Sequence, residues 1–411
     1  MAQTANDVAT TLNGNYKTTY ANDLEEAIPD GVKVTPTMEL LKGEQQQGGT
    51  YAQPVLLGLE HGFTYAAGDS VANLNAAVAG KLETATVTGY QIVGRAEFGW
   101  TVAARAVGPN KFRPAVGIVL ESLMMSGKKR GEIALMYGQS GLGTVASVSG
   151  SILTMTASDF SEGHWVGMVG CPIDVYTSTA LTQQCKITKV DISTPTSPKL
   201  TVDNVGTIAA ADVVYFRTAY GNECQGAYSI LSTTTGNIFG ISTTTYSDLW
   251  TGTTYSAGSA ALTYAKVVKA CAQALPRGGE GKFKFFVHPN SWQDLVNEPE
   301  VARVSSDSYW TPKRIERGSN DIKFHSVAGE IELVPSTYVK RSHAFGFLQD
   351  GSWKRIGSTD WTMRIPGVNG GEPFYPLENA GGLGVRVYAD WAPFCRKIAG
   401  SVLITGITPS T

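Results

Sequence analysis

The chain has 411 residues, more than one hydrophobic core usually serves, so two or three lobes are expected. Its 42% hydrophobic and 17% charged residues indicate a globular protein, and its 46 glycines and Thr/Ser-rich stretches favour strands and turns over helical bundles. We therefore expect a β-rich α+β fold. The 33 basic and 35 acidic side chains give a net charge of −2, which excludes an overall field that attracts nucleic acid or an anionic membrane.

The cysteines and the N-terminus bear on the compartment. The cysteines are odd in number, lie far apart and form no CxxC pair, which argues against a disulfide framework and a zinc site; they are Cys171, Cys185, Cys224, Cys271 and Cys395. The first residues lack the basic start and apolar run of a signal peptide, and no later apolar run is long enough to span a membrane. We expect a reducing, cytosol-like space and no metal or other cofactor.

The first two segments have few partners within their own sequence. Residues 1–47 hold little that can form a core, and short helices are predicted there at 22–27 and 36–41, so this segment is expected to be an arm. Two runs rich in β-branched and aromatic residues follow, at 50–67 and 85–106. They predict one long hairpin, which is barely stable unless another part of the fold or another subunit covers it.

The strongest helix signal comes next, at residues 112–125, and residues 126–137 either continue this helix or kink it. After the glycine loop GQSGLG, which is expected to be a hinge, the pattern switches to short strands. Five strands in this space predict a small barrel inserted into a larger domain; they are expected at 151–156, 163–177, 185–192, 199–202 and 213–217.

The second half of the chain predicts a mixed domain. Residues 232–255 read as a loop, and Ser259 is expected to cap a helix that runs to Leu275. A strand at 282–288 leads into a second helix capped by Asn290. The remaining elements are strands, expected at 322–325, 330–335, 343–348, 353–356, 385–390 and 396–405.

Cys224, in the stretch YGNECQGAYSI, is the first candidate for chemistry. A nucleophilic cysteine needs a base and a positive environment that lowers its pKa, whereas the adjacent Glu223 raises it. We therefore favour a packed corner over a catalytic loop. The five histidines form no HxH or HExxH pair, which favours ordinary strand or turn histidines over metal ligands; they are His61, His164, His288, His325 and His343.

The order of these pieces resembles the major capsid proteins of tailed bacteriophages, which have the Hong Kong 97-like fold. The most specific stretches are YGNECQGAYSIL, FVHPNSWQDLVNEPEVAR and IKFHSVAGEIELVPSTYVK, followed by WKRIGSTDWTMRIPG and VRVYADWAPFCRKIAGSVLITGI. The resemblance implies six segments: an N-terminal arm at 1–47, an extended loop at 48–106, a spine helix of the P-like domain at 107–138, an inserted small β-barrel at 139–221, a peripheral, A-like domain at 222–340, and return strands at 341–411.

The resemblance also implies a function without catalysis. The protein would self-assemble into pentamers and hexamers of an icosahedral head shell that encloses double-stranded phage DNA, would be built in the host cytoplasm, and would reside in the virion. The expected partners are a separate scaffolding protein, a portal and a decoration protein. The expected contacts between copies are Leu24, Leu40, Phe63, Tyr65, Tyr90, Phe98 and Trp100, and the basic cluster Lys128, Lys129 and Arg130 is either a solvated face or faces DNA.

Three other hypotheses stay open at the level of sequence. An encapsulin-like compartment has the same fold and differs in its cargo. A cysteine hydrolase would use Cys224, and would lose activity but not assembly in Cys224→Ala. A β-rich tail or receptor-binding protein would form tubes or trimers rather than closed shells.

Overall fold

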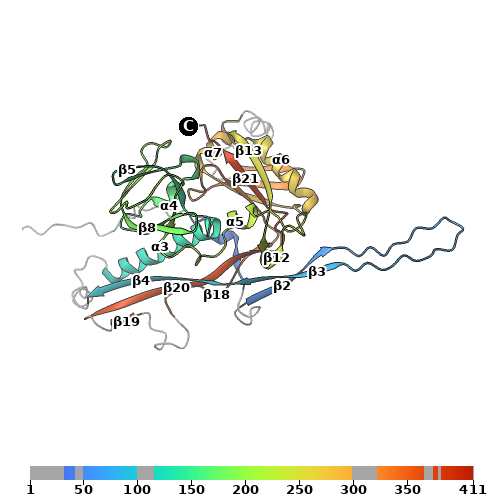
Figure 1. Ribbon diagram of the computed structural model, residues 1–411, viewed down its shortest axis with the longest axis horizontal. Helices are drawn as coiled ribbons and strands as arrows, with labels where there is room; N and C mark the ends of the chain where they lie inside the picture. Colours follow the sequence, from blue (N-terminus) through green and yellow to red (C-terminus); the bar gives the residue numbers. More distant parts are fainter. Residues whose placement is uncertain are drawn as a thin grey trace, which may run out of the picture. The chain divides into compact units, whose positions relative to one another are not determined.

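The computed structural model describes residues 32–41, 50–99, 115–298, 322–364, 374–377 and 381–410 (Figure 1). The chain divides into two compact units. The large unit comprises Asp30–Val93, Ser126–Thr362 and Tyr388–Thr411, and the small unit comprises Met1–Pro29, Gly94–Met125 and Met363–Val387. The predicted helix at 22–27 lies outside the described residues.

The small unit contains strand ends and part of a helix. Strand β19 (Phe374–Pro376) pairs antiparallel with the start of β20 (Gly382–Cys395), so that Phe374 lies opposite Val385. The guanidinium of Arg386 lies 5.5 Å from the centre of the Tyr375 ring, a cation–π contact.

Helix α3 (Ala115–Tyr137) is continuous over 23 residues, so residues 126–137 continue the predicted helix. Its last turns, from Ile133 to Tyr137, are buried on every side. A helix that is apolar all round belongs in a core, and this end of α3 is part of the main hydrophobic core of the large unit.

A closed barrel of six strands follows α3, in the order β10-β5-β6-β9-β8-β7. Its strands are β5 (Gly143–Ser149), β6 (Ile152–Met155), β7 (Pro172–Thr177), β8 (Ala180–Asp191), β9 (Lys199–Val202) and β10 (Val213–Phe216). The predicted strand at 163–177 was wrong in its first half, because Glu162–Trp165 forms the short helix α4. Strand β5 was not predicted, because glycine, alanine and serine interrupt its valines and threonine.

A second sheet has six strands in the order β13-β21-β17-β14-β16-β15. The strands are β13 (Thr253–Ala260), β14 (Phe283–Val287), β15 (Ile322–Ser326), β16 (Gly329–Pro335), β17 (Ala344–Leu348) and β21 (Val402–Ile407). Helices α6 (Tyr264–Ala274) and α7 (Pro289–Val296) contribute Val267, Cys271 and Leu295 to the core of this sheet.

Three details of this region differ from the sequence-based expectation. Ser259 does not cap α6, because β13 runs through it; the cap is Thr263, whose hydroxyl accepts from the Lys266 N–H. The cap of α7 is His288 rather than Asn290, since Nδ1 of His288 accepts from the Asn290 N–H at 3.2 Å. The predicted loop at 232–255 contains β11 (Asn237–Ile238), β12 (Ile241–Ser242) and the start of β13.

The predicted helix at 36–41 was also wrong. Thr35–Thr37 forms a single 3-10 turn, and β1 (Glu39–Leu40) then pairs parallel with β18 (Trp353–Thr362) at the edge of a five-stranded sheet, β1-β18-β20-β19, in which β4 also pairs with β20. Val34 and Met38 are fully buried. This stretch is therefore part of the core of the large unit.

The long hairpin has a different second strand from the predicted one. Strand β2 (Thr50–Gly58) pairs antiparallel with β3 (Lys81–Thr88), whereas β4 (Tyr90–Gly99) leaves the hairpin and pairs with β20. Gly89 separates β3 from β4, and a Cβ at Gly89 would lie 2.3 Å from Oδ1 of Asp390. Because similar β-rich sequence continues on both sides of Gly89, the pattern predicted a single run and could not show the change of partner.

Candidate assembly interface

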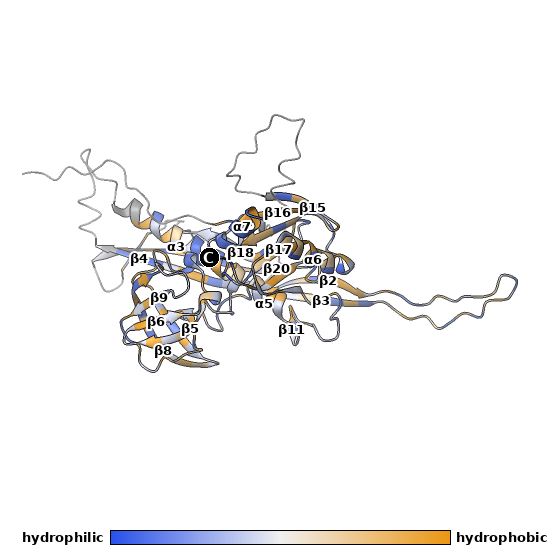
Figure 2. Ribbon diagram, turned by 90° about the horizontal axis from the view of Figure 1, so that it is seen from above, coloured by the Kyte–Doolittle hydropathy of each residue, from blue (hydrophilic) through white to orange (hydrophobic). Residues whose placement is uncertain are grey.

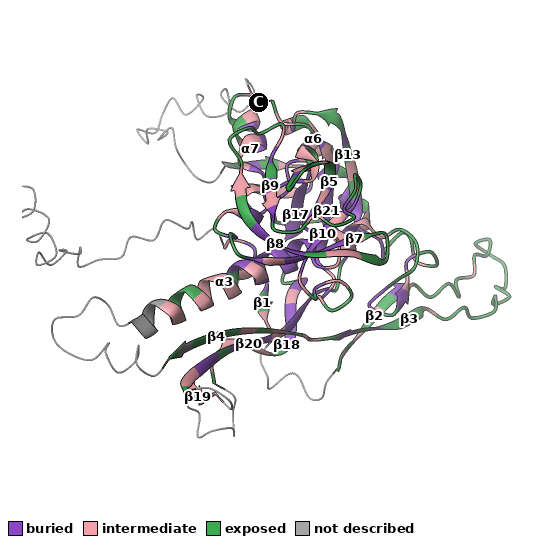
Figure 3. Cartoon of the chain, turned by 60° about the vertical axis from the view of Figure 1, so that its left-hand side comes forward, coloured by how far each residue is buried: buried purple, intermediate pink, exposed green. Residues whose placement is uncertain are grey.

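The segment between β2 and β3, residues 59–80, is an extended surface of the large unit and is here called the projecting loop. It extends away from the body of the unit (Figures 1 and 2) and is exposed along its length (Figure 3). The exposed fractions reach 95% at Tyr65, 92% at Val71 and 87% at Leu74. A soluble monomer rarely exposes a continuous set of large apolar side chains, so this loop is a candidate interface.

The loop is nearly uncharged. Glu60 and Asp69 are the carboxylates in residues 59–80, and the sequence has no lysine or arginine there. Its two sides are held together by polar contacts: the Asn75 N–H donates to the Thr64 hydroxyl at 2.8 Å, and the His61 N–H donates to the Val78 carbonyl at 3.0 Å. Low charge with exposed apolar groups is typical of a surface that another protein covers.

The hairpin below the loop has two different faces. Leu57, Ala85 and Val87 are buried in the main core. On the other face, Leu56 and Leu82 lie directly opposite each other across the two strands, and both are exposed. The apolar surface of the loop therefore continues down one face of its supporting strands.

The seven interface residues predicted from sequence have different positions. Phe63 and Tyr65 lie on the projecting loop and are exposed, whereas Leu40 and Tyr90 are half-buried against the main core. Leu24, Trp100 and the side chain of Phe98 lie outside the described residues. Other exposed apolar residues were not predicted, because the sequence does not show which apolar side chains the subunit leaves uncovered; they are Leu56, Leu59, Val71, Leu74, Val78 and Leu82.

Residues 32–41, here called the strap, are fixed to helix α3 by one buried carboxylate. Glu132 is fully buried and accepts hydrogen bonds from the backbone N–H groups of Lys33 at 2.8 Å, Val34 at 2.6 Å and Thr35 at 2.8 Å. At the far end of the strap, Nε of Arg355 donates to the Met38 carbonyl at 2.9 Å. A carboxylate that accepts several N–H bonds is well satisfied in a core, so the strap is firmly held.

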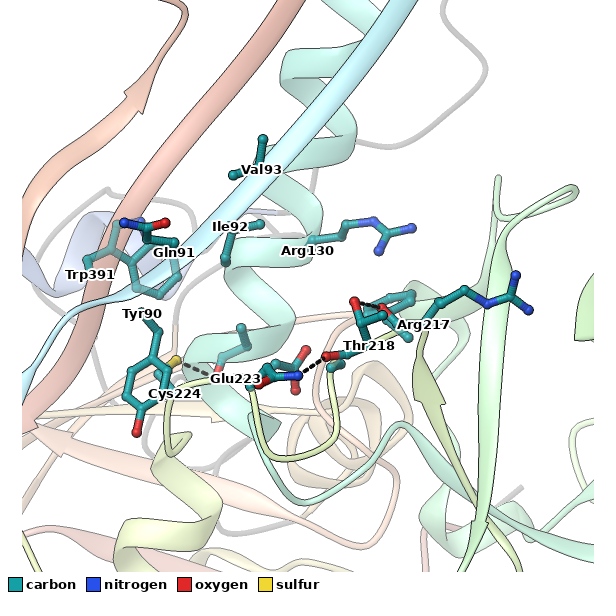
Figure 4. Close-up of a pocket in the computed structure, with 14 residues that line it drawn as sticks. Tyr90, Gln91, Ile92, Val93, Arg130, Arg217, Thr218, Glu223, Cys224 and Trp391 are labelled. Carbon is teal, nitrogen blue, oxygen red and sulfur yellow. Dashed lines mark hydrogen bonds between the residues drawn. The ribbon is translucent and has the colours of Figure 1, made fainter. Parts of the chain in front are cut away.

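The cavity beside Cys224 shows no catalytic arrangement. It has a volume of about 340 Å³ and is lined by residues that include Arg130, Arg217, Glu223, Cys224 and Trp391 (Figure 4). The thiol of Cys224 points to the Ala134 carbonyl of α3 at 3.9 Å. Burial, and then the charge of Glu223, raise the pKa of this thiol, and none of the described lining residues is a histidine. These contacts favour the packed corner.

His164, His288 and His343 take part in structural contacts, whereas His61 and His325 are exposed. Nε2 of His288 donates to the Glu162 carboxylate at 2.8 Å, and Nε2 of His164 donates to the Tyr338 carbonyl at 2.9 Å. Burial and the nearby Lys340 ammonium lower the pKa of both His164 and His343 to about 3, so both are neutral near pH 7. Within the described ranges, no group of three or more His, Cys, Asp or Glu side chains could hold a metal ion.

The basic cluster does not form one exposed face. Lys128 is exposed, but Lys129 is buried, its ammonium donates to the Val166 carbonyl, and burial lowers its pKa to about 8. The guanidinium of Arg130 lies 4.3 Å from the centre of the Phe216 ring and donates to Sγ of Cys171 at 3.2 Å. A contact with DNA therefore stays a proposal for Lys128 alone.

Comparisons with known proteins identify the fold. No protein-family model matches the chain, and no curated protein matches its sequence. Among solved structures, the chain is similar to a chain of the cyanophage A-1(L) capsid asymmetric unit, with a TM-score of 0.59 and 12% identity over 97% of this chain and 99% of that chain. It is also similar to a chain of the capsid of a native GTA particle, with a TM-score of 0.52 and 5% identity over 98% of each chain.

A third match is to the holo-SrpI encapsulin complex from Synechococcus elongatus PCC 7942, with a TM-score of 0.45 and 8% identity over 98% of this chain and 97% of that chain. The TM-score of this match is lower than those of the first two. The first match confirms, at the level of the fold, the predicted resemblance to phage capsid proteins, and the second is also to a capsid chain. In the part of the chain that the structure describes, no helix has the length and apolar character needed to cross a membrane.

Proposed function

We propose that this protein is the major capsid protein of a tailed bacteriophage, a structural protein whose copies assemble into a closed shell. The observation that carries the proposal is the exposed, nearly uncharged projecting loop on a capsid-type fold. Burying one large apolar side chain contributes about 1.5–3 kcal/mol, so several such residues per copy, repeated around a ring, supply the driving force for assembly.

The geometry of such a contact is heterologous. A loop that projects from one copy reaches a different surface on its neighbour, and a contact of this kind closes into rings when the rotation between copies permits. We propose pentamers and hexamers that form an icosahedral head around double-stranded DNA. A separate scaffolding protein, a portal and a decoration protein complete the proposed set of partners, and the shell is assembled in the host cytoplasm.

The segments of the chain have proposed roles in this shell. Residues 1–47 include an arm that contacts neighbours, although the strap within them belongs to the subunit core. The barrel at residues 143–216 is the proposed inserted domain, the six-stranded sheet with α6 and α7 is the proposed peripheral domain, and α3 is the proposed spine helix. The exposed Lys128 is the proposed contact with packaged DNA.

Electron microscopy and light scattering of the purified protein, expressed with and without a scaffolding partner, test the proposal. The wild type should form closed shells or capsomer rings. The double variant Tyr65→Asp with Leu74→Asp places charges on the loop and should leave folded subunits that do not assemble. The matched control is Val327→Asp, at an exposed valine outside the loop, which should assemble normally.

Several outcomes would contradict the proposal. A stable monomer or dimer of the wild type under all conditions would sink it, and so would normal shells from the double variant. Tubes or trimers would favour a tail protein, and shells that hold an enzyme rather than nuclease-protected DNA would favour an encapsulin-like compartment. Hydrolase activity that is lost in Cys224→Ala would favour the enzyme hypothesis.

A further inference from the structure

A tight turn between β11 and β12 contacts the base of the projecting hairpin. The Thr86 N–H of β3 donates to the Phe239 carbonyl at 2.8 Å, which adds a backbone hydrogen bond from outside the hairpin. The Tyr246 hydroxyl donates to Oε1 of Glu83 on the same strand at 2.9 Å. Figure 1 shows β12, and Figure 2 shows β11, next to β3.

The turn has an unusual conformation at its tip. Phe239 has a φ of 52° and Gly240 a φ of 84°, so both central residues lie in the left-handed region. Glycine and asparagine tolerate this region, whereas phenylalanine is a genuine outlier there. A residue held against its own preference is retained when surrounding contacts determine its position, and such residues often mark a functional constraint.

The Phe239 side chain explains the constraint. Its ring lies 4.9 Å from the Phe394 ring of β20, and Phe394 in turn lies 5.6 Å from the Tyr51 ring of β2. With this turn conformation, the carbonyl of Phe239 faces β3, and its ring packs against Phe394, which contacts Tyr51 of β2. Phe239 therefore bonds to β3 directly and is linked to β2 through the Phe394 ring.

Trp250 holds the turn by a hydrogen bond, and Arg277 in turn holds the segment that contains Trp250. The buried Trp250 donates through Nε1 to the Ile238 carbonyl at 2.9 Å. Arg277, just after α6, donates to the carbonyls of Ser247 and Thr251, each at 2.8 Å. The segment that carries Trp250 is thus fastened to the end of α6, and a planar guanidinium suits this role because its donors are fixed in direction.

We propose that the turn Ile238–Ile241 is a positioning element that sets the direction of the projecting hairpin, with Phe239 as its central positioning residue and Arg277 as its anchor. This inference rests on the proposed function, because direction matters when the loop must reach a neighbouring copy. The residues that would orient the loop lie between Ile238 and Arg277, distant in sequence from the loop itself.

Hydrogen exchange on dispersed subunits provides the first test. In Phe239→Ala, the amides of residues 84–88 should exchange at least tenfold faster than in the wild type, and Phe239→Tyr, which keeps the ring, should restore slow exchange. The matched control is Phe324→Ala, because both phenylalanines are 8% exposed and Phe324 lies in the core of the six-stranded sheet. This control should lose stability without faster exchange at residues 84–88.

A second variant separates the fold of the turn from its contact. Phe239→Asn suits a turn with two positive φ angles, so the turn should stay closed while the ring contact is lost. Assembled Phe239→Asn should give open or irregular particles, whereas Phe324→Ala should give shells of wild-type diameter at reduced yield. Unchanged exchange in Phe239→Ala, or regular shells from Phe239→Asn, would overturn the inference.

The two proposals fail in different ways. Exchange is measured on dispersed subunits and requires no assembly, so a wild type that never assembles would contradict the proposed function while leaving the role of the turn measurable. A wild type that assembles, with exchange at residues 84–88 insensitive to Phe239, would contradict the positioning role alone.

Discussion

The carboxylate of Glu132 accepts two hydrogen bonds from Thr35, one from its backbone N–H at 2.8 Å and one from its hydroxyl at 2.6 Å. The same carboxylate also accepts the N–H groups of Lys33 and Val34. A single side chain of α3 thereby replaces the water that the first turn of the strap would otherwise bind. The strap and α3 are about a hundred residues apart in sequence, and this contact joins them.

We predict that Glu132→Ala destabilises the subunit by about 2–4 kcal/mol, because it leaves buried N–H donors of the strap unpaired. Urea unfolding of dispersed subunits, followed by tryptophan fluorescence, measures the loss. Hydrogen exchange of residues 33–38 should rise in parallel. The control is Lys128→Ala on the same helix, whose exposed side chain should change stability by less than about 0.5 kcal/mol. Equal urea midpoints for Glu132→Ala and Lys128→Ala would contradict the prediction.

The cysteine thiols are expected to be unreactive in the native protein. All five are free and buried. Burial raises the pKa of Cys185 to about 11 and the pKa of Cys271 and Cys395 to about 12, and it also raises the pKa of Cys171 and Cys224. Because the thiolate is the reactive form, a thiol reagent at pH 8 should label none of them in the native protein.

Mass spectrometry of protein treated with iodoacetamide measures this labelling. Protein unfolded in urea is the positive control and should take up five labels. Rapid labelling of Cys224 in the native state would show an exposed, activated thiol, and would return the hydrolase hypothesis to consideration.

The sequence predicted elements best where their side chains are β-branched or aromatic and their ends are marked. Strand β9 (Lys199–Val202) lies at the predicted residues, because it is a short apolar run after the turn-rich STPTSP. Strand β14 and the helix after it were also predicted, since phenylalanines alternate with lysines before a proline that starts α7. These signals are local, and local patterns are what a single sequence shows.

Long-range contacts account for what the sequence did not show. The burial of Val34 and Met38 depends on Glu132 and Arg355, and nothing near the strap indicates them. The projecting loop was predicted as part of a hairpin, but the exposure of Leu74 or Val71 follows from the absence of any described packing partner there. Periodicity identifies apolar positions; it does not show whether the subunit itself covers them.

Acid should destabilise the subunit, and the loss of stability should begin at a pH well above the usual pKa of carboxylates. His164 and His343 have pKa values lowered to about 3, below the value of about 6.5 in an unfolded chain. Their contribution to stability is complete above pH 6.5 and is lost as the pH falls toward 3, at up to about 1.4 kcal/mol per pH unit for each histidine.

Burial opposes the ionised form of Glu162, but hydrogen bonds from His288 and Arg341 outweigh it and lower its pKa to about 2. Its contribution is lost below about pH 4.3.

Urea unfolding of dispersed subunits at pH values from 7 to 4 checks this dependence. His164→Gln should be less stable at pH 7 and should show a shallower fall between pH 6.5 and 4, because one titrating group is gone. The control is His325→Gln, which removes an exposed histidine, and His164→Gln should show the shallower slope of the two variants. A slope for His164→Gln equal to that of the wild type would show that this histidine does not remain neutral in the folded state.

Two glycines at the corner beside Cys224, Gly138 and Gly226, allow two backbone segments to pack closely. Gly226 donates its N–H to the Gly138 carbonyl at 3.0 Å, so the end of α3 and the segment that leaves the barrel touch backbone to backbone. A Cβ at Gly138 would lie 2.2 Å from the Cys224 carbonyl oxygen, and a Cβ at Gly226 would lie 2.4 Å from the Gly138 nitrogen. Backbone atoms cannot move aside as a flexible side chain can. The two glycines in GQSGLG and NECQG thus permit close packing.

We expect Gly138→Ala and Gly226→Ala each to destabilise the subunit by about 3 kcal/mol, at the upper end of the range for overpacked sites. The double variant should cost less than the sum of the two, because both substitutions separate the same pair of segments. Gly68→Ala is the matched control: a Cβ at Gly68 would meet no other atom within 4 Å, so the urea midpoint of this variant should equal that of the wild type. Wild-type stability in Gly138→Ala would mean that this corner is a loose hinge, as the glycine loop alone suggested, rather than a close-packed joint.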